Sequence, residues 1–180
     1  MSTRVPCTFG ALLLPFVAIA QQIEQSSVVD ASLSDFSNLH PLVVHIPIVL
    51  LLVAVVTQIA SFFVWKLELD WVTFLALVGA TLGAFLAGKV FHPHTTNLSP
   101  AAQQVIDTHD TWADYTIWSA VLATVLKGVD LFWLRTRWVA IVTTVVLVFS
   151  TVAVSVASHY GATLVYIHGV GVQGNYVEGD

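Results

Sequence analysis

The feature that most constrains the fold is a set of four apolar runs, each long enough to cross a lipid bilayer. The runs lie at 42–64, 72–90, 112–134 and 138–157. A transmembrane helix needs about 20 predominantly apolar residues, because the hydrocarbon core is roughly 30 Å thick. Only 9% of the residues are charged, whereas soluble domains carry roughly a quarter. The sequence therefore predicts an all-α membrane protein.

The links between these runs predict an antiparallel bundle and its orientation. The first and third links, WKLELDW and RTRW, are short, whereas the middle link, FHPHTTNLSPAAQQVIDTHD, is longer and polar. Lys66, Arg135 and Arg137 lie at the short links, and cytoplasmic loops carry the excess of lysine and arginine. We therefore expect an antiparallel four-helix transmembrane bundle with both mature termini and the middle link in the periplasm. Lys127 should extend its ammonium group toward the cytoplasmic side.

Rows of small residues predict close helix packing. Small side chains at four-residue spacing let membrane helices approach each other, and such rows could equally clear space for a flat cofactor. The rows contain Gly79, Gly83 and Gly88 in the second run and Ala153, Ala157 and Gly161 in the fourth. Close packing is the simpler interpretation.

The N-terminal segment has the layout of a secretory signal peptide. Arg4 is followed by an apolar stretch and then by Ala18-Ile19-Ala20, where cleavage is expected. A fifth span is the alternative, but the stretch is short and contains proline and glycine. The domain prediction is a signal peptide at 1–20, a periplasmic segment at 21–38, a four-span bundle at 39–172 and a C-terminal tail at 173–180.

The sulfur-containing residues exclude several classes of cofactor site. The single cysteine, Cys7, and the single methionine, Met1, both lie within the predicted signal peptide. A mature chain would then lack disulfides, thiolate sites, covalently attached haem and methionine ligands. Any metal would be held by nitrogen or oxygen atoms. The net charge of −5 also argues against a nucleic-acid-binding surface.

All the histidines are predicted to lie at or near the periplasmic end of the bundle. They are His40, His45, His92, His94, His109, His159 and His168. His45 should lie within the apolar region, where an ionisable residue indicates a functional site. His94 and His159 taken singly are more simply explained as helix-capping or hydrogen-bonding groups. Several imidazoles converging from different helices indicate a metal or haem site.

The spacing of the histidines limits how they can act together. His40 precedes Pro41, which suits a first helical turn, and Pro47 should bend the helix nearby. His45 lies about 140° around the helix from His40 and roughly 7.5 Å deeper, so the two cannot chelate one ion from the same face. Trp112 shares the helix face of His109 and could form a wall of the site.

Two end motifs and one internal histidine carry a family resemblance. The opening LHPLVVHIP, a histidine near the start of the third run and the closing LVYIHGVGV resemble a family of small four-span bacterial membrane proteins of unknown function. Its members look like b-type membrane cytochromes. The resemblance covers 39–172 and implies His40, His45, His109 and His168 as cofactor ligands. His92, His94 and His159 look like additions in this chain, and His92 and His159 are weaker candidates for the site.

The leading functional hypothesis is a b-type cytochrome subunit of the bacterial inner membrane. One or two haem b groups would be held by pairs of histidines between helices. The subunit would transfer electrons at the periplasmic side, with other respiratory subunits, quinone or a periplasmic cytochrome c as partners. An electron-transfer subunit is favoured over a stand-alone enzyme, because no catalytic triad or phosphate-binding loop is present.

Two alternatives remain open at the level of sequence. The first is a non-haem site for zinc, copper or iron, in which Asp107, Asp110 and Asp114 would join His92 and His94. These carboxylates are explained equally well as the solvated start of a helix. The second alternative is a non-catalytic anchor subunit of a respiratory complex.

Overall fold

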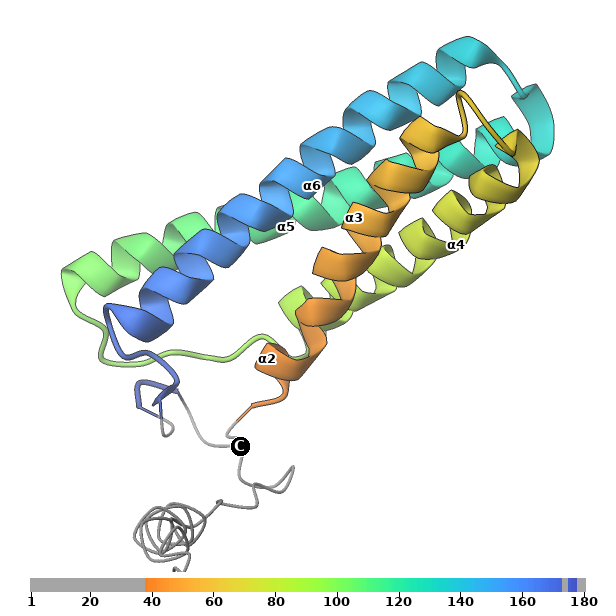
Figure 1. Cartoon of the computed structure of the whole chain (residues 1–180). Coiled ribbons are helices and arrows are strands. Elements are labelled where there is room, and N and C mark those ends of the chain that lie inside the picture. The colour runs from red at the N-terminus through yellow and green to blue at the C-terminus, as the bar shows by residue number, and fades with distance from the viewer. Residues whose placement is uncertain (1–37, 173–174, 178–180) are drawn as a thin grey trace, which may run out of the picture. The chain divides into compact units, whose positions relative to one another are not determined.

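The computed structural model describes residues 38–172 and 175–177, and helices fill most of these ranges (Figure 1). Their bounds are α2 (His40–Val43), α3 (His45–Ala60), α4 (Lys66–Phe85), the π-helical turn η3 (Leu86–Val90), α5 (Pro100–Val129), the π-helical turn η4 (Asp130–Leu134) and α6 (Arg137–Tyr166). Together they make four helices long and apolar enough to cross a membrane. Within the described ranges no strand is formed, and the predicted all-α four-span fold is confirmed. The predicted signal peptide lies outside these ranges.

The four long helices run antiparallel (Figure 1). Helix α3 packs against α4 and α6, and α5 packs against the same two helices. The short links, 61–65 and 135–136, lie at one end, which we call the short-link end. The start of α2, the link 91–99 and the end of α6 lie at the other, which we call the histidine end. The orientation of the two ends across the membrane stays a prediction.

The first span is interrupted near Pro47. Helix α2 ends at Val43 and α3 begins at His45, with Val44 as a turn between them. Pro47 has no N–H to donate to the carbonyl of Val43, four residues earlier. The sequence predicts a bend beside the two histidines of the opening motif, and the structure has an interruption of the helix there.

The third and fourth helices extend beyond their apolar runs. Helix α5 begins at Pro100 rather than near residue 112, because the Ser99 hydroxyl caps it by accepting a hydrogen bond from the Ala102 N–H (3.2 Å). Helix α6 continues past residue 157 to Tyr166. Hydropathy marks only the lipid-embedded part of a helix. The extensions place His109 within α5, well past its first turn.

Close packing of α3 on α4 depends on glycine. A Cβ atom at Gly83 would lie 2.9 Å from Ile46 Cγ2 and 3.0 Å from Pro47 Cδ, and one at Gly79 would lie 2.7 Å from Leu50 Cδ1. Both distances at Gly83 involve atoms near the α3 backbone, so a larger residue would push the helices apart. The close-packing interpretation of the second run is confirmed at these positions.

Lys127 does not extend its ammonium group to the membrane surface. Its side chain is fully buried, and Nζ donates to Asp70 Oδ1 at 2.6 Å. The sequence-based expectation was wrong because a carboxylate on α4 lies within reach inside the bundle. A buried counter-charge replaces the water that the ammonium group would otherwise seek.

The segment after α6 folds back onto the bundle. Val170 packs with Ile106 and Leu164 in a small buried cluster at the histidine end. Thr95 and Val177 form an isolated antiparallel bridge. These contacts hold the link 91–99 near the end of α6.

Candidate functional site

A cavity of about 400 Å³ lies among the helices at the histidine end. It receives side chains from α2, α3, α4, η3, α5 and α6, and most of its walls are apolar or small. Its lining includes Val44, Ile48, Ala84, Ala87, Gly88, Ala113, Ile117, Val154, Ala157, Gly161 and Ala162. The histidines that line it are His40, His45, His92 and His109. We call this space the histidine cavity.

Two of these imidazoles are fixed by backbone carbonyl groups. His40 Nδ1 lies 2.9 Å from the Ala87 oxygen, and His109 Nδ1 lies 2.8 Å from the Ala157 oxygen. Since a carbonyl oxygen only accepts, each Nδ1 must carry the hydrogen and donate it. In a neutral ring this leaves Nε2 with a free lone pair. A histidine that binds a metal is oriented by the same kind of hydrogen bond.

The rings of His40 and His109 are close enough to share a ligand. Their centroids are 6.4 Å apart and their planes are inclined by 71°. Two metal–nitrogen bonds of about 2.0–2.1 Å each, plus half a ring on either side, span roughly this distance. The two residues come from different helices, α2 and α5, so neither ring is limited by the spacing along a single helix.

The local structure around each ring explains how it is positioned. Ala87 belongs to η3, and π-helical turns of this kind are frequent at functional sites. A Cβ atom at Gly161 would lie 3.3 Å from His109 Cε1 and 3.4 Å from Nδ1. The missing side chain at Gly161 therefore makes room for the His109 ring beside α6. The predicted row of small residues thus serves the site here as well as the packing.

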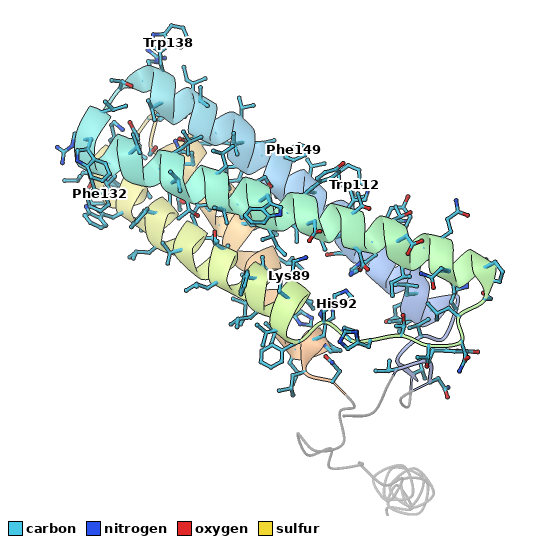
Figure 2. All side chains as sticks on the ribbon, turned by 180° about the vertical axis from the view of Figure 1, so that it is seen from behind. Lys89, His92, Trp112, Phe132, Trp138 and Phe149 are labelled. Atoms are coloured by element: carbon cyan, nitrogen blue, oxygen red, sulfur yellow. The ribbon has the colours of Figure 1, made fainter. Side chains whose placement is uncertain are left out.

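His92 forms a third imidazole at the cavity, in the link before α5. Its ring centroid is 5.9 Å from that of His40, and its Nε2 lies 3.0 Å from Asp110 Oδ1. The hydrogen bond to Asp110 raises the pKa of His92 above its ordinary value of 6.5. Figure 2 shows His92 beside Lys89 at the end of the second span, and Lys89 pairs with Asp114 at 2.6 Å. The Lys89–Asp114 pair joins the end of the second span to α5, and the His92–Asp110 pair joins the following link to α5.

The remaining candidates occupy different positions. His45 lines the cavity but has an exposed side chain, and His94 is exposed. His168 lies in the turn after α6, outside the lining of the cavity. Trp112 packs edge to face with Tyr115, which neighbours Phe149 (Figure 2). It belongs to an aromatic row on α5 and α6 and does not line the cavity.

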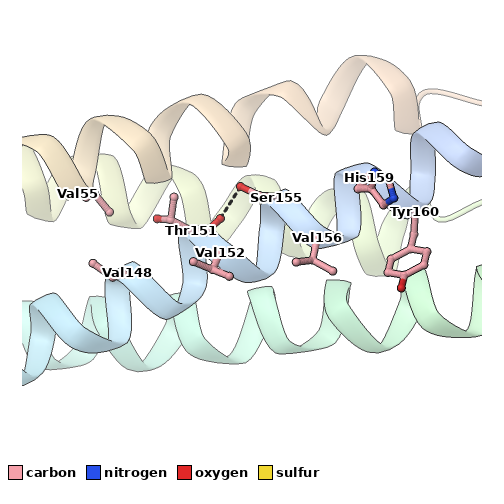
Figure 3. Close-up of a pocket in the computed structure, with 8 residues that line it drawn as sticks. All are labelled: Val55, Val148, Thr151, Val152, Ser155, Val156, His159 and Tyr160. Carbon is pink, nitrogen blue, oxygen red and sulfur yellow. Dashed lines mark hydrogen bonds between the residues drawn. The ribbon is translucent and has the colours of Figure 1, made fainter.

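His159 lies on a separate groove of about 420 Å³ along α6 (Figure 3). Four of its eight lining residues are valines, and Tyr160 lies beside His159. The Ser155 hydroxyl donates to the Thr151 carbonyl oxygen of the same helix at 2.8 Å. The groove thus offers an apolar surface, and it is distinct from the histidine cavity.

Sequence reasoning missed the groups that orient the rings. The carbonyl groups of Ala87 and Ala157 leave no trace in side-chain patterns, since any residue carries one. The sequence offers Asp110 as a metal ligand or as part of the solvated start of a helix, whereas it pairs with His92. The sequence contains one signal for the His92–Asp110 pair, namely that the polar link 91–99 leads into the acidic first half of α5. Among the described residues no group of three or more histidine, cysteine or acidic side chains is arranged to hold a metal ion.

Comparisons with known proteins identify a family. No curated protein and no solved structure matches this chain. Residues 37–174 match the family model described as "Predicted membrane protein (DUF2231)". That match covers the four spans, the histidine cavity and the turn after α6. The chain therefore belongs to the family of predicted membrane proteins DUF2231.

Proposed function

We propose that this protein is a b-type cytochrome subunit that holds haem between His40 and His109 in the histidine cavity. The observation that carries the proposal is the arrangement of these two rings. They come from different helices, each Nδ1 is fixed by a carbonyl, and their centroids are 6.4 Å apart. Haem iron binds strong nitrogen ligands such as histidine, and the Nε2 atoms of these two residues would hold it.

The cavity suits a flat, mostly apolar cofactor. Its volume of about 400 Å³ falls within the range of roughly 300–1,000 Å³ typical of cofactor sites. Ala84, Ala87 and Gly88 on one side and Ala157 and Gly161 on the other keep the walls thin. Haem b, when bound, would supply one-electron oxidation and reduction. The axial pair would satisfy two imidazoles that are otherwise costly inside a membrane.

Other residues of the chain would set the surroundings of the cofactor. Ala87 and Ala157 would hold the axial rings in orientation and increase the basicity of Nε2. His92, bonded to Asp110, contributes a polar group to a largely apolar wall. His45 is a further imidazole that lines the cavity. It is therefore the first candidate to hold a second cofactor or to replace one of the two histidine ligands.

The cellular setting follows from charge and from the position of the cavity. We propose that the histidine end faces the periplasm of a bacterial inner membrane, because Lys66, Arg135 and Arg137 lie at the short-link end. Electron partners would then be respiratory subunits, quinone or a periplasmic cytochrome c. In intact cells, a membrane-impermeant thiol reagent should label Asn97→Cys and spare Arg137→Cys, in chains whose Cys7 is replaced by serine. The reverse labelling would overturn this orientation.

Single substitutions test the axial pair. His40→Ala and His109→Ala should each convert a low-spin haem spectrum to a high-spin one or abolish haem binding, because the part of the chain that the structure describes contains no methionine or cysteine to replace them. His94→Ala is the matched control, since His94 is exposed and lies outside the lining of the cavity. A low-spin spectrum that is unchanged in both His40→Ala and His109→Ala would refute this pair as ligands. The spectrum of His45→Ala shows whether the exposed imidazole of His45 also binds the haem iron.

A non-haem metal site is the second candidate, and His92 is the observation that favours it. The ring of His92 lies 5.9 Å from that of His40, so His92 is the nearest candidate for a third imidazole ligand for zinc, copper or iron. The three rings are not arranged to hold a metal ion in this structure, so His92 would have to leave Asp110 and turn toward the His40–His109 pair. Elemental analysis of the purified protein separates the two candidates. Stoichiometric zinc or copper without porphyrin would favour the non-haem site.

A further inference from the structure

A second group of buried polar residues lies in the opposite half of the bundle from the histidine cavity. We call it the inner polar centre and define it by Gln58 of α3, Asp70 of α4, Lys127 of α5 and Asp130 of η4. Their exposed fractions are 0%, 5%, 0% and 2%. Ionisable side chains at such depth in a membrane bundle are costly and mark functional sites. The proposed haem site uses none of them.

The charged members of the centre are connected to the short-link end. Lys127 Nζ donates to Asp70 Oδ1 at 2.6 Å, and Lys66 Nζ donates to Asp70 Oδ2 at 2.7 Å. The Lys66 side chain is 61% exposed, whereas that of Lys127 is fully buried. Asp70 therefore lies between a buried ammonium group and one that reaches the surface.

Three buried polar atoms of the centre remain without a hydrogen-bonding partner within the described residues. They are Gln58 Nε2, Gln58 Oε1 and Asp130 Oδ1. An unpaired buried polar group destabilises a fold, and more so when it is charged. Native structures seldom leave such groups unpaired, and an ordered water or an ion commonly explains the exceptions.

The chemistry of these atoms identifies what would pair with them. Gln58 offers both a donor and an acceptor, whereas Asp130 Oδ1 only accepts. A metal cation could pair with either oxygen, but it would leave Gln58 Nε2 unpaired, and beside Asp130 it would be repelled by Lys127. An anion would be repelled by Asp70 and Asp130. Water both donates and accepts, so one kind of ligand serves all three atoms.

An apolar layer lies in the middle of the bundle core. It is formed by Leu51, Ala54, Ala76, Leu77, Ala80, Ala120, Ala123, Leu147 and Val154, which make one buried cluster. Water at the inner polar centre would therefore enter from the short-link end, past the exposed Lys66. The layer keeps that water apart from the histidine cavity.

We propose that the inner polar centre binds water molecules that enter from the short-link end and form hydrogen bonds with Gln58 and Asp130. The charged groups that neighbour Lys127 are Asp70, Asp130 and Lys66, while α3 contributes Gln58 and α6 carries no charged residue between Arg137 and His159. The protein would then contain a polar site at each end, separated by a dry core. This proposal does not depend on the identity of the cofactor.

Thiol accessibility tests the proposal directly. In a chain with Cys7 replaced by serine, Gln58→Cys places a thiol at the centre, and Ala54→Cys places one on the same face of α3, one turn away in the apolar layer. Both positions have an exposed fraction of 0%. A small, water-soluble methanethiosulfonate reagent should modify the thiol at position 58 at least about tenfold faster than the thiol at position 54, because thiolates form only in contact with water. Equal, slow rates at both positions would overturn the proposal.

A second measurement keeps the test decisive if the Gln58→Cys chain does not fold. Gln58→Leu removes the amide and keeps a similar volume. If water satisfies the amide, the substitution loses those hydrogen bonds and lowers Tm. If the amide is unpaired in a dry core, its removal relieves a cost and raises Tm. A raised Tm would contradict hydration of the centre.

Discussion

Replacing Lys127 by methionine should destabilise the bundle far more than any other lysine substitution in the described part of the chain. Methionine keeps most of the length and volume of the side chain but leaves Asp70 without its buried partner at 2.6 Å. Removing one member of a buried ion pair costs about 3–5 kcal/mol. Because Lys66 still pairs with Asp70 at 2.7 Å, we expect a loss of free energy of unfolding near the lower limit, about 3 kcal/mol.

Lys89→Met provides a matched control on the same protein. Lys89 pairs with Asp114 at a similar distance, 2.6 Å, but both side chains are about half exposed. Exposed pairs contribute about 0–1 kcal/mol. Reversible unfolding in mixed micelles, with Asp70→Asn and the double variant completing a cycle, gives the coupling energy. A loss for Lys127→Met that is no larger than that of Lys89→Met would refute the buried-pair reasoning.

Three further predictions concern packing and pH. Gly83→Leu should lower yield and Tm much more than Val72→Leu, since a Cβ at position 83 already meets Ile46 at 2.9 Å; similar Tm values for the two would contradict the close contact. Gly161→Val should displace the His109 ring, which lies 3.3 Å from the position of the added Cβ, and change the cofactor spectrum while the helical circular dichroism is retained; an unchanged spectrum would refute that role. Because the folded-state pKa of His92 is raised above 6.5, its stabilising effect should be complete below about pH 6.5 and be lost as pH rises through the folded-state pKa; a His92→Gln chain with the same pH dependence of stability as the natural chain would contradict this.

Hydropathy and local rules predict the architecture of this protein because both act through short stretches of chain. The apolar runs mark the four spans, Pro41 and Pro47 mark the start of the first helix and its interruption, and the lengths of the links require antiparallel neighbours. The start of α5 escaped prediction because a Ser99 cap and Pro100 begin the helix in a polar stretch, where hydropathy gives no signal.

The site was predictable as a location but not as a set of contacts. The histidines all fall near one end, and His40, His45, His92 and His109 do line one cavity. Sequence favoured His45 because it is embedded in an apolar run, yet its side chain is exposed. The decisive contacts join residues far apart in the chain, such as His109 with the carbonyl of Ala157. Such pairings depend on how the helices are rotated and shifted against each other, which periodicity does not encode.

The ion pair of the inner polar centre also could not be predicted from the sequence. A lysine near the end of a span is ordinarily expected to extend its charged group to the surface. Lys127 remains inside because Asp70, in the first turns of α4, meets it across the bundle. Asp70 and Lys127 are 57 positions apart in the chain. Their pairing becomes evident only once α4 and α5 are placed side by side.

The most direct test of the central proposal is the optical spectrum of the purified wild-type protein, oxidised and then reduced, with a pyridine haemochrome assay on the same sample. The account predicts a Soret band, a low-spin b-type reduced-minus-oxidised spectrum and about one non-covalent haem b per chain, or two if His45 holds a second. A folded, helical protein with no Soret absorption and no extractable haem, when expressed with an ample supply of haem, would contradict it.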